Sequence, residues 1–187
     1  MNNAIYDLNE ELEIIFNVPE HSISAEARSR CTLELIKIFH ELNRILIPGQ
    51  QIEILALPSE IGSHKDKIQL RAQWLNLAAG GTSLLAALLM LLTSILENSK
   101  GDKPNLSITI NAIEINLHST KIAKPTSNYF KILKDTHDVS GVNFQSNSNK
   151  SSKPSYINIP RQKFDAFIKN EDSDIGKKII RKPLEVI

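Results

Sequence analysis

The chain has 187 residues, of which 41% are hydrophobic and 23% are charged, so it is long enough for one domain with a real core or for a domain with an appendage. Its 22 Lys and Arg residues nearly balance its 21 Asp and Glu residues, which argues against a protein that binds nucleic acid by charge alone. A single cysteine, Cys31, excludes an internal disulfide and a cysteine-based zinc cluster, and it fits a reducing compartment. Residues 1–5 lack the basic and apolar segments of a secretion signal, so we expect cytoplasmic residence.

The first part of the chain predicts the order strand, helix, strand, turn and strand. Apolar residues alternate with other residues at 12–18, which is typical of a strand. A helix follows, because Ser22 or Ser24 can cap its start and apolar residues then recur at three- and four-residue spacing. Two further strands are predicted at 51–57 and 67–72, with turn residues between them.

An uncharged segment at residues 74–96 is the most unusual feature of the sequence. As a helix with a rise of about 1.5 Å per residue it would span roughly 35 Å, which exceeds the roughly 30 Å hydrocarbon layer of a bilayer. Small or polar residues fall along one side of this helix, and Leu and Ile cover the other. The predicted interaction face of the helix comprises Trp74, Asn76, Gly80, Ser83, Ala87, Leu88, Leu91 and Ile95.

This two-sided pattern suits a core helix, a helix shared between subunits, or a membrane span that dimerises through small residues. Strands are predicted directly before and soon after the segment, and strands on opposite sides of a bilayer could not share one sheet. We therefore favour burial in protein, including burial in a subunit interface, over a membrane span. The inner or cell membrane is the alternative location if residues 74–96 do span a bilayer.

The remaining sequence predicts shorter elements and one loop. These are a long half-buried strand at 107–118, a short helix at 129–135, a mobile Ser/Asn-rich loop at 142–153, a short strand at 156–159, a helix at 160–169 and a strand-like tail at 179–187. The predicted fold class is α+β, with a mostly antiparallel sheet of four or more strands and two main helices packed on it, one of them the uncharged helix. We expect a core domain at residues 1–143, a flexible Ser/Asn-rich loop at 144–154 and a strand-helix-strand appendage at 155–187.

Motifs for catalysis, cofactors or metals are missing from the sequence. The five histidines contain no pair at the spacing that places two imidazoles on one helical face, and there is no Gly-x-Ser-x-Gly nucleophile motif. The Gly80-Gly81-Thr82-Ser83 run lacks the lysine of a phosphate-binding loop. We therefore predict no catalytic, cofactor or metal site, and we expect a protein that is not an enzyme.

Four basic residues near aromatic residues are the candidates for nucleic-acid contact: Lys131, Lys134, Arg161 and Lys163. With a sequence pI near 7.8 the electrostatic attraction is weak, so an ordinary solvated surface is the favoured interpretation and no nucleic-acid partner is expected.

Three functional hypotheses follow from these patterns. The leading one is a non-enzymatic assembly component that self-associates, or docks on a larger protein, through the uncharged helix. The alternative is a single-pass or membrane-inserting protein that uses residues 74–96. The third is a nucleic-acid-binding accessory protein.

Overall fold

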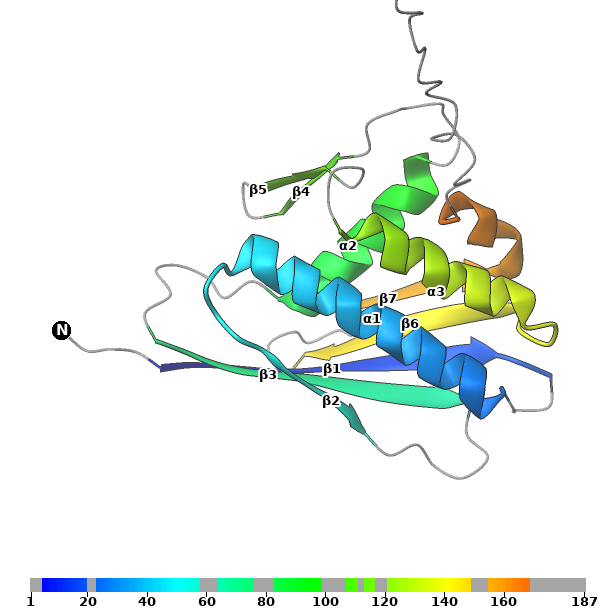
Figure 1. The fold of residues 1–187 in the computed structure, drawn as a ribbon, viewed down its shortest axis with the longest axis horizontal. Coiled ribbons are helices and arrows are strands. Elements are labelled where there is room, and N and C mark those ends of the chain that lie inside the picture. Colours follow the sequence, from blue (N-terminus) through cyan, green and yellow to red (C-terminus); the bar gives the residue numbers. More distant parts are fainter. Residues whose placement is uncertain are drawn as a thin grey trace, which may run out of the picture.

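The computed structural model describes residues 5–19, 23–57, 64–75, 83–98, 107–110, 113–116, 121–148 and 155–168. Five strands form one antiparallel sheet in the order β2-β3-β1-β6-β7, and helices cover one of its faces (Figure 1). The strands are β1 (Ile5–Asn17), β2 (Glu53–Leu57), β3 (Lys65–Leu75), β6 (Gly141–Ser148) and β7 (Ser155–Pro160). This arrangement confirms the predicted α+β fold class with its antiparallel sheet.

Strand β1 is the central strand and pairs with β3 from Ile5 to Ile15 on one side and with β6 from Glu10 to Asn17 on the other. Its side chains alternate, since Leu12, Ile14 and Phe16 are buried whereas Glu11 and Glu13 lie on the outer face. On that outer face the amino groups of lysines from β3 lie within 3.8 Å of both glutamates. One face of the sheet is therefore the core face, and the other is polar.

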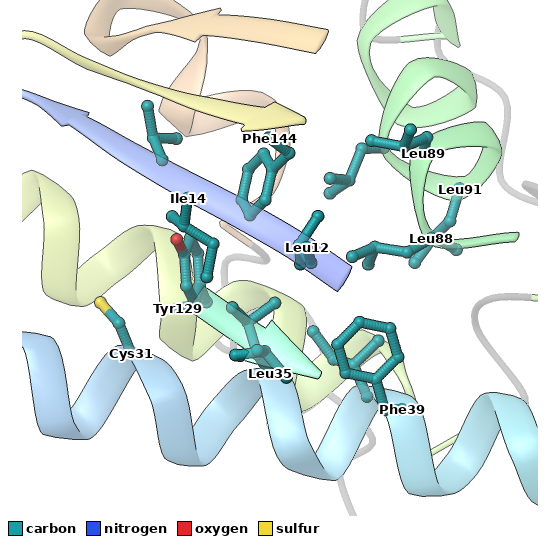
Figure 2. Close-up of a cluster of buried hydrophobic side chains, with 14 of the residues drawn as sticks. Leu12, Ile14, Cys31, Leu35, Phe39, Leu88, Leu89, Leu91, Tyr129 and Phe144 are labelled. Carbon is teal, nitrogen blue, oxygen red and sulfur yellow. The ribbon is translucent and has the colours of Figure 1, made fainter. Parts of the chain in front are cut away.

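Helices α1 (Ala25–Leu46) and α3 (Ala123–Asp135) cover the core face beside each other. Ser24 starts α1 as its N-cap, because its Oγ accepts a hydrogen bond of 3.1 Å from the backbone N–H of Ala27. Gly49, at a φ of +82°, reverses the chain just after α1. Figure 2 shows side chains from β1, α1, α2 and α3 meeting in one core.

The uncharged helix is shorter than predicted and begins later. Trp74 and Leu75 are the end of strand β3, where they pair with β1, so the prediction that the helix begins at Trp74 is wrong. Helix α2 spans Leu84–Asn98. Its start has two acceptors for its first free amides: Ser83 Oγ accepts from Ala86 N–H at 3.0 Å, and Glu10 Oε2 of β1 accepts from Leu85 N–H at 3.2 Å.

Within the part of the chain that is described, no helix has the length and apolar character needed to cross a bilayer. Helix α2 instead buries most of its leucines in the core of the chain, where it contacts α1, β1, β6 and β7. Its buried residues are Leu84, Leu85, Ala87, Leu88, Leu89, Leu91 and Leu92.

The predicted long strand at 107–118 is wrong, because the structure has two short strands there. Strands β4 (Ser107–Ile110) and β5 (Ile113–Asn116) pair antiparallel with each other, with Ile110 opposite Ile113. The sequence carries a sign of this reversal: the apolar residues occupy even positions up to Ile110 and odd positions from Ile113 onward. A continuous strand would have kept one phase.

The mobile loop predicted at 142–153 is also wrong where the structure describes it. Residues 141–148 form strand β6, and its Val142 and Phe144 are fully buried. Its polar residues lie on both faces of the sheet, since Asn143 and Gln145 are half-buried on the outer face whereas Ser146 is buried on the core face. Residues 149–154, and the tail at 179–187, lie outside the described residues.

The C-terminal described part completes the sheet. Strand β7 confirms the strand predicted at 156–159 and pairs with β6 at the edge of the same sheet as β1. A 3₁₀ helix, η1 (Arg161–Ala166), follows Pro160 where a helix to residue 169 was predicted. Its Phe164 and the following Phe167 pack against Phe130 of α3, with ring centroids 5.4 and 3.9 Å away.

We predict that Leu88→Ala lowers the free energy of unfolding by about 2–5 kcal/mol, because the Leu88 side chain is fully buried and its removal leaves a cavity. Met90→Ala, on the same helix but 47% exposed, should change it by less than about 0.5 kcal/mol. Urea unfolding followed by circular dichroism measures both. Equal losses in the two variants would contradict the described orientation of α2.

Candidate interaction surface

The free edge of strand β2 is one candidate surface. Strand β2 is the terminal strand on one side of the sheet, and among the described residues its backbone pairs with β3 alone. Its sequence, Glu53 followed by Ile-Leu-Ala-Leu, contains no charge after its first residue and no proline. None of its five side chains is fully buried. An edge of this kind presents unpaired backbone groups with apolar side chains beside them.

A groove runs beside this edge, between helix α1 and strands β2 and β3. We call it the α1/β2 groove; its volume is about 490 Å³, and it is lined by Ala25, Arg28, Ser29, Thr32, Leu33, Ala56, Leu57, Asp66, Lys67 and Ile68. Leu33 is 56% exposed and contributes a large apolar side chain to the wall of the groove. The groove therefore adds apolar surface directly next to the free edge.

An ion pair at one end of the groove holds helix α1 against strand β3. Asp66 is buried on the core face of β3, and its Oδ1 accepts hydrogen bonds from Nε (3.0 Å) and Nη2 of Arg28. The same Nη2 donates to the backbone carbonyl of Lys65 at 3.0 Å. Because both partners are largely enclosed, this contact positions α1 more firmly than a surface pair would.

A second groove lies on the other side of α1, where α1 and α3 run antiparallel. Two adjoining hollows of about 590 and 310 Å³ form it and share Glu34, Lys37 and Asn128. We call it the α1/α3 groove; its other lining residues are Arg30, Leu33, His40, Glu41, Arg44, Lys121, Lys124, Pro125, Lys131, Ile132 and Asp135. Its Lys and Arg residues outnumber its Asp and Glu residues two to one, whereas the chain as a whole is nearly balanced.

Glu41 ties the two sides of the α1/α3 groove together. Its buried carboxylate accepts hydrogen bonds from Arg44 Nη2 at 2.7 Å and Nε at 2.8 Å, and a longer one from the backbone N–H of Lys121 at 3.3 Å. These donors lower the pKa of Glu41 below its ordinary value, the Arg44 hydrogen bond most of all, although burial acts in the opposite direction. Glu41 is therefore a charged residue that holds the start of α3 beside the end of α1.

The predicted interaction face of the uncharged helix does not form one exposed surface. Trp74 lies in β3, and Asn76 and Gly80 lie outside the described residues. Ser83 caps the helix, while Ala87, Leu88 and Leu91 are fully buried in the core of the same chain and Ile95 is half-buried against that core. The side chains that α2 exposes are instead Ala86, Met90, Thr93 and Glu97.

The four predicted nucleic-acid candidates occupy separate places. Lys131 lines the α1/α3 groove, Lys134 pairs with Asp165 of η1 at 2.5 Å, and Lys163 is exposed on η1. Arg161 has a structural contact: its guanidinium donates to the carbonyls of Thr136 and Val139 at 2.8 and 2.7 Å, and also to those of Leu133 and Lys134. It thus satisfies the free carbonyls at the end of α3.

The buried Cys31 is not placed for nucleophilic chemistry. Burial raises the pKa of its thiol to about 12, with Asp66 adding to the shift, so the thiolate is scarce at neutral pH. The neighbouring Tyr129 is fully buried, and burial raises its pKa well above the ordinary value. Among the residues with described positions, no three His, Cys, Asp or Glu side chains gather in a way that could hold a metal ion.

Comparison of the chain with protein-family models, with curated proteins and with solved structures finds no match.

The surfaces along α1 were not anticipated from the sequence. One available signal was the seven-residue spacing of Arg30, Lys37 and Arg44 on α1, which is repeated by Lys124 and Lys131 on α3. The free edge of β2 had no local signal, because the sheet order depends on pairing between distant segments.

We predict that Glu41→Gln lowers the free energy of unfolding by about 1–2 kcal/mol at neutral pH, because it weakens hydrogen bonds made by a charged acceptor. Since the pKa of Glu41 is lower in the folded than in the unfolded protein, this contribution is complete above the ordinary value of 4.5 and is lost as pH falls through the folded pKa. Urea unfolding between pH 7 and pH 3 should therefore show the wild type and the variant converging at low pH.

Glu26→Gln is the matched control, because Glu26 is exposed on the same helix and lies 3.7 Å from Arg30. It should change the free energy of unfolding little at any pH. A Glu41→Gln effect that is independent of pH would show that the carboxylate charge does not contribute.

Proposed function

We propose that this protein is a non-enzymatic assembly component that self-associates through the free edge of strand β2. The observation that carries the proposal is an apolar edge strand that pairs on one side only among the described residues and lies beside the open α1/β2 groove. Self-association was also the leading hypothesis from the sequence, but the proposed surface is a different one, since the leucines of α2 are occupied in the core of their own chain.

The two edges of the sheet differ in how they are protected. Natural edge strands are commonly shielded from pairing by proline, by lysine or by a bulge. Strand β7, at the opposite edge, ends at Pro160 and continues directly into η1. Strand β2 has no proline or lysine within Ile54–Leu57, although Pro58 follows it in sequence, and its flanking groove is lined by Leu33, Ala56 and Leu57. Edge pairing is therefore favoured at β2.

A second copy of the chain suits this edge because the strand is complementary to itself. If two β2 strands pair antiparallel about Leu55, each Leu55 faces the other Leu55, and Ile54 faces Ala56. Glu53 then lies at the outer ends of the pairing, where water can reach it. A two-fold interface of this kind closes on itself and joins two five-stranded sheets into one.

The grooves extend the contact beyond the strands. Five residues per strand bury little area alone, whereas a stable dimer typically buries about 1,200 Å² or more. Ile54 and Ala56 lie on the side of β2 that faces α1, since they pair with the buried Leu70 and Ile68. Side chains from the second copy would thus enter the α1/β2 groove next to Leu33.

Charge substitutions at Leu55 test the proposal, including its register. Leu55→Lys alone should weaken dimerisation by about tenfold or more, because it places two ammonium groups opposite each other. Leu55→Glu alone should do the same. An equimolar mixture of the two variants should recover a dimer that contains one copy of each, which light scattering coupled to size-exclusion chromatography and native mass spectrometry can measure.

Asn158→Lys on strand β7 is the matched control, because it adds the same charge to an exposed position of the opposite edge strand. It should leave the dimer intact. The proposal is refuted if the wild type stays monomeric at all concentrations, or if Leu55→Lys dimerises as the wild type does.

A further inference from the structure

The α1/α3 groove carries regularly spaced positive charge. On α1, Arg30, Lys37 and Arg44 follow one another at intervals of seven residues, so successive ones lie about 10.5 Å apart along one side of the helix. On α3, Lys124 and Lys131 repeat the same spacing on the other wall of the groove. The two rows thus face a common groove along most of the length of α1.

The lysines on the α3 side of the groove make no described ion pair, although the charge of Lys121 is among the causes that lower the pKa of Glu41. The basic residues on α1 each have an acidic partner one turn away: Lys37 lies 2.7 Å from Glu34, and Arg44 lies 2.7 Å from Glu41. By contrast, the exposed Lys121, Lys124 and Lys131 form no ion pair with any residue whose position is described. An acidic ligand in the groove would meet three available ammonium groups.

The floor of the groove carries an acceptor as well. Glu34 Oε2 is buried and receives no hydrogen bond from the described residues, although Glu34 Oε1 is paired with Lys37. Asn128, which lines both halves of the groove, lies on the opposite helix. A ligand that fills the groove therefore needs a hydrogen-bond donor near its centre in addition to negative charge.

These features distinguish a peptide from a nucleic acid. A phosphate chain offers only acceptors where it is charged, so it would oppose the Glu34 carboxylate. No Phe, Tyr or Trp side chain lines either half of the groove, so there is no platform on which bases could stack. A peptide combines carboxylates with backbone N–H donors and satisfies both requirements.

We propose that the α1/α3 groove binds an acidic peptide segment of a partner protein. The carboxylates of the segment pair with Lys121, Lys124 and Lys131, and a donor of its backbone reaches Glu34. This site shares only Leu33 with the α1/β2 groove among their lining residues, so it is distinct from the proposed self-association surface. Its test is therefore independent of the test of dimerisation.

The test uses a fluorescein-labelled peptide of seven Glu-Ser repeats, a matched peptide with Gln in place of Glu, and an oligothymidylate of equal length. Fluorescence anisotropy at about 0.15 M ionic strength measures their binding to the full chain. We expect saturable binding of the Glu-Ser peptide and weaker or absent binding of the other two. Tighter binding of the oligothymidylate, or no saturable binding of the Glu-Ser peptide, overturns the proposal.

Three charge-reversal variants locate the binding. Lys124→Glu and Lys131→Glu should each weaken Glu-Ser binding by about tenfold, whereas Lys163→Glu makes the same change of net charge on η1, outside the groove, and should have no effect. Thermal unfolding verifies that all three variants fold. An equal loss in Lys163→Glu would mean that diffuse charge, and not the groove, attracts the peptide.

The affinity of the Glu34→Ala variant for the Glu-Ser peptide separates a specific hydrogen bond from general attraction between opposite charges. If charge alone governed binding, removal of this acidic residue would tighten it. If Glu34 accepts a hydrogen bond from the peptide, the variant binds more weakly. Tighter binding by Glu34→Ala therefore contradicts the assignment of a peptide donor to Glu34.

Discussion

The position of strand β1 in the middle of the sheet determines most of what surrounds it. Both of its edges are paired, and the inward side chains of Leu12, Ile14 and Phe16 form the base on which the helices pack. The same inward row includes Glu10, which is buried and accepts the amide N–H of Leu85. A carboxylate at this point is favourable because the first turn of a helix carries partial positive charge. A residue of β1 thus helps to fix where the Leu-rich helix begins.

This constraint explains why α2 is a core element. A helix composed largely of leucine could shift along an apolar surface with little change in energy, since its neighbouring positions are chemically alike. Polar contacts at Ser83 and Glu10 give it one position. With α2 held in the core, most of its leucines are buried within the chain, and the two described grooves lie along the flanks of α1. On one flank, the α1/β2 groove places apolar side chains beside the edge strand β2. On the other flank, the α1/α3 groove carries regularly spaced Lys and Arg side chains.

The fold class was predictable from the periodicity of apolar residues, but the ends of several helices and strands were not. Helix α1 is confirmed because its apolar spacing and the Ser24 cap agree. The start of α2 was misplaced, because the end of β3 and the helix share an apolar composition, and the acceptor from Glu10 is 75 residues away in sequence. Strand β6 was taken for a loop because Ser and Asn dominate it, although burial of Val142 and Phe144 stabilises it.

The two proposed surfaces depend still more on contacts between distant segments. That β2 is an edge strand within the described part of the sheet follows from the order of its five strands, which no local pattern of residues specifies. The lysines of α3 were visible in sequence, and Lys131 was among the predicted candidates. Their relation to α1 was not visible, because the antiparallel approach of the two helices depends on tertiary contacts such as the one between Glu41 and Lys121. The sequence thus showed which residues carry positive charge, but only the fold shows that those of α1 and α3 line one groove.

The pairing of β1 also affects how the chain folds as it is synthesised. Strand β1 ends at Asn17 and leaves the ribosome before one of its two neighbours in the sheet, β6, which ends at Ser148. At typical elongation rates of about 5–20 residues per second, one side of β1 therefore waits on the order of ten seconds for its partner. During that interval one edge of β1 is unpaired and its inward row of Leu12, Ile14 and Phe16 lacks part of its cover, so slower elongation lengthens the time for which chaperones can bind this segment.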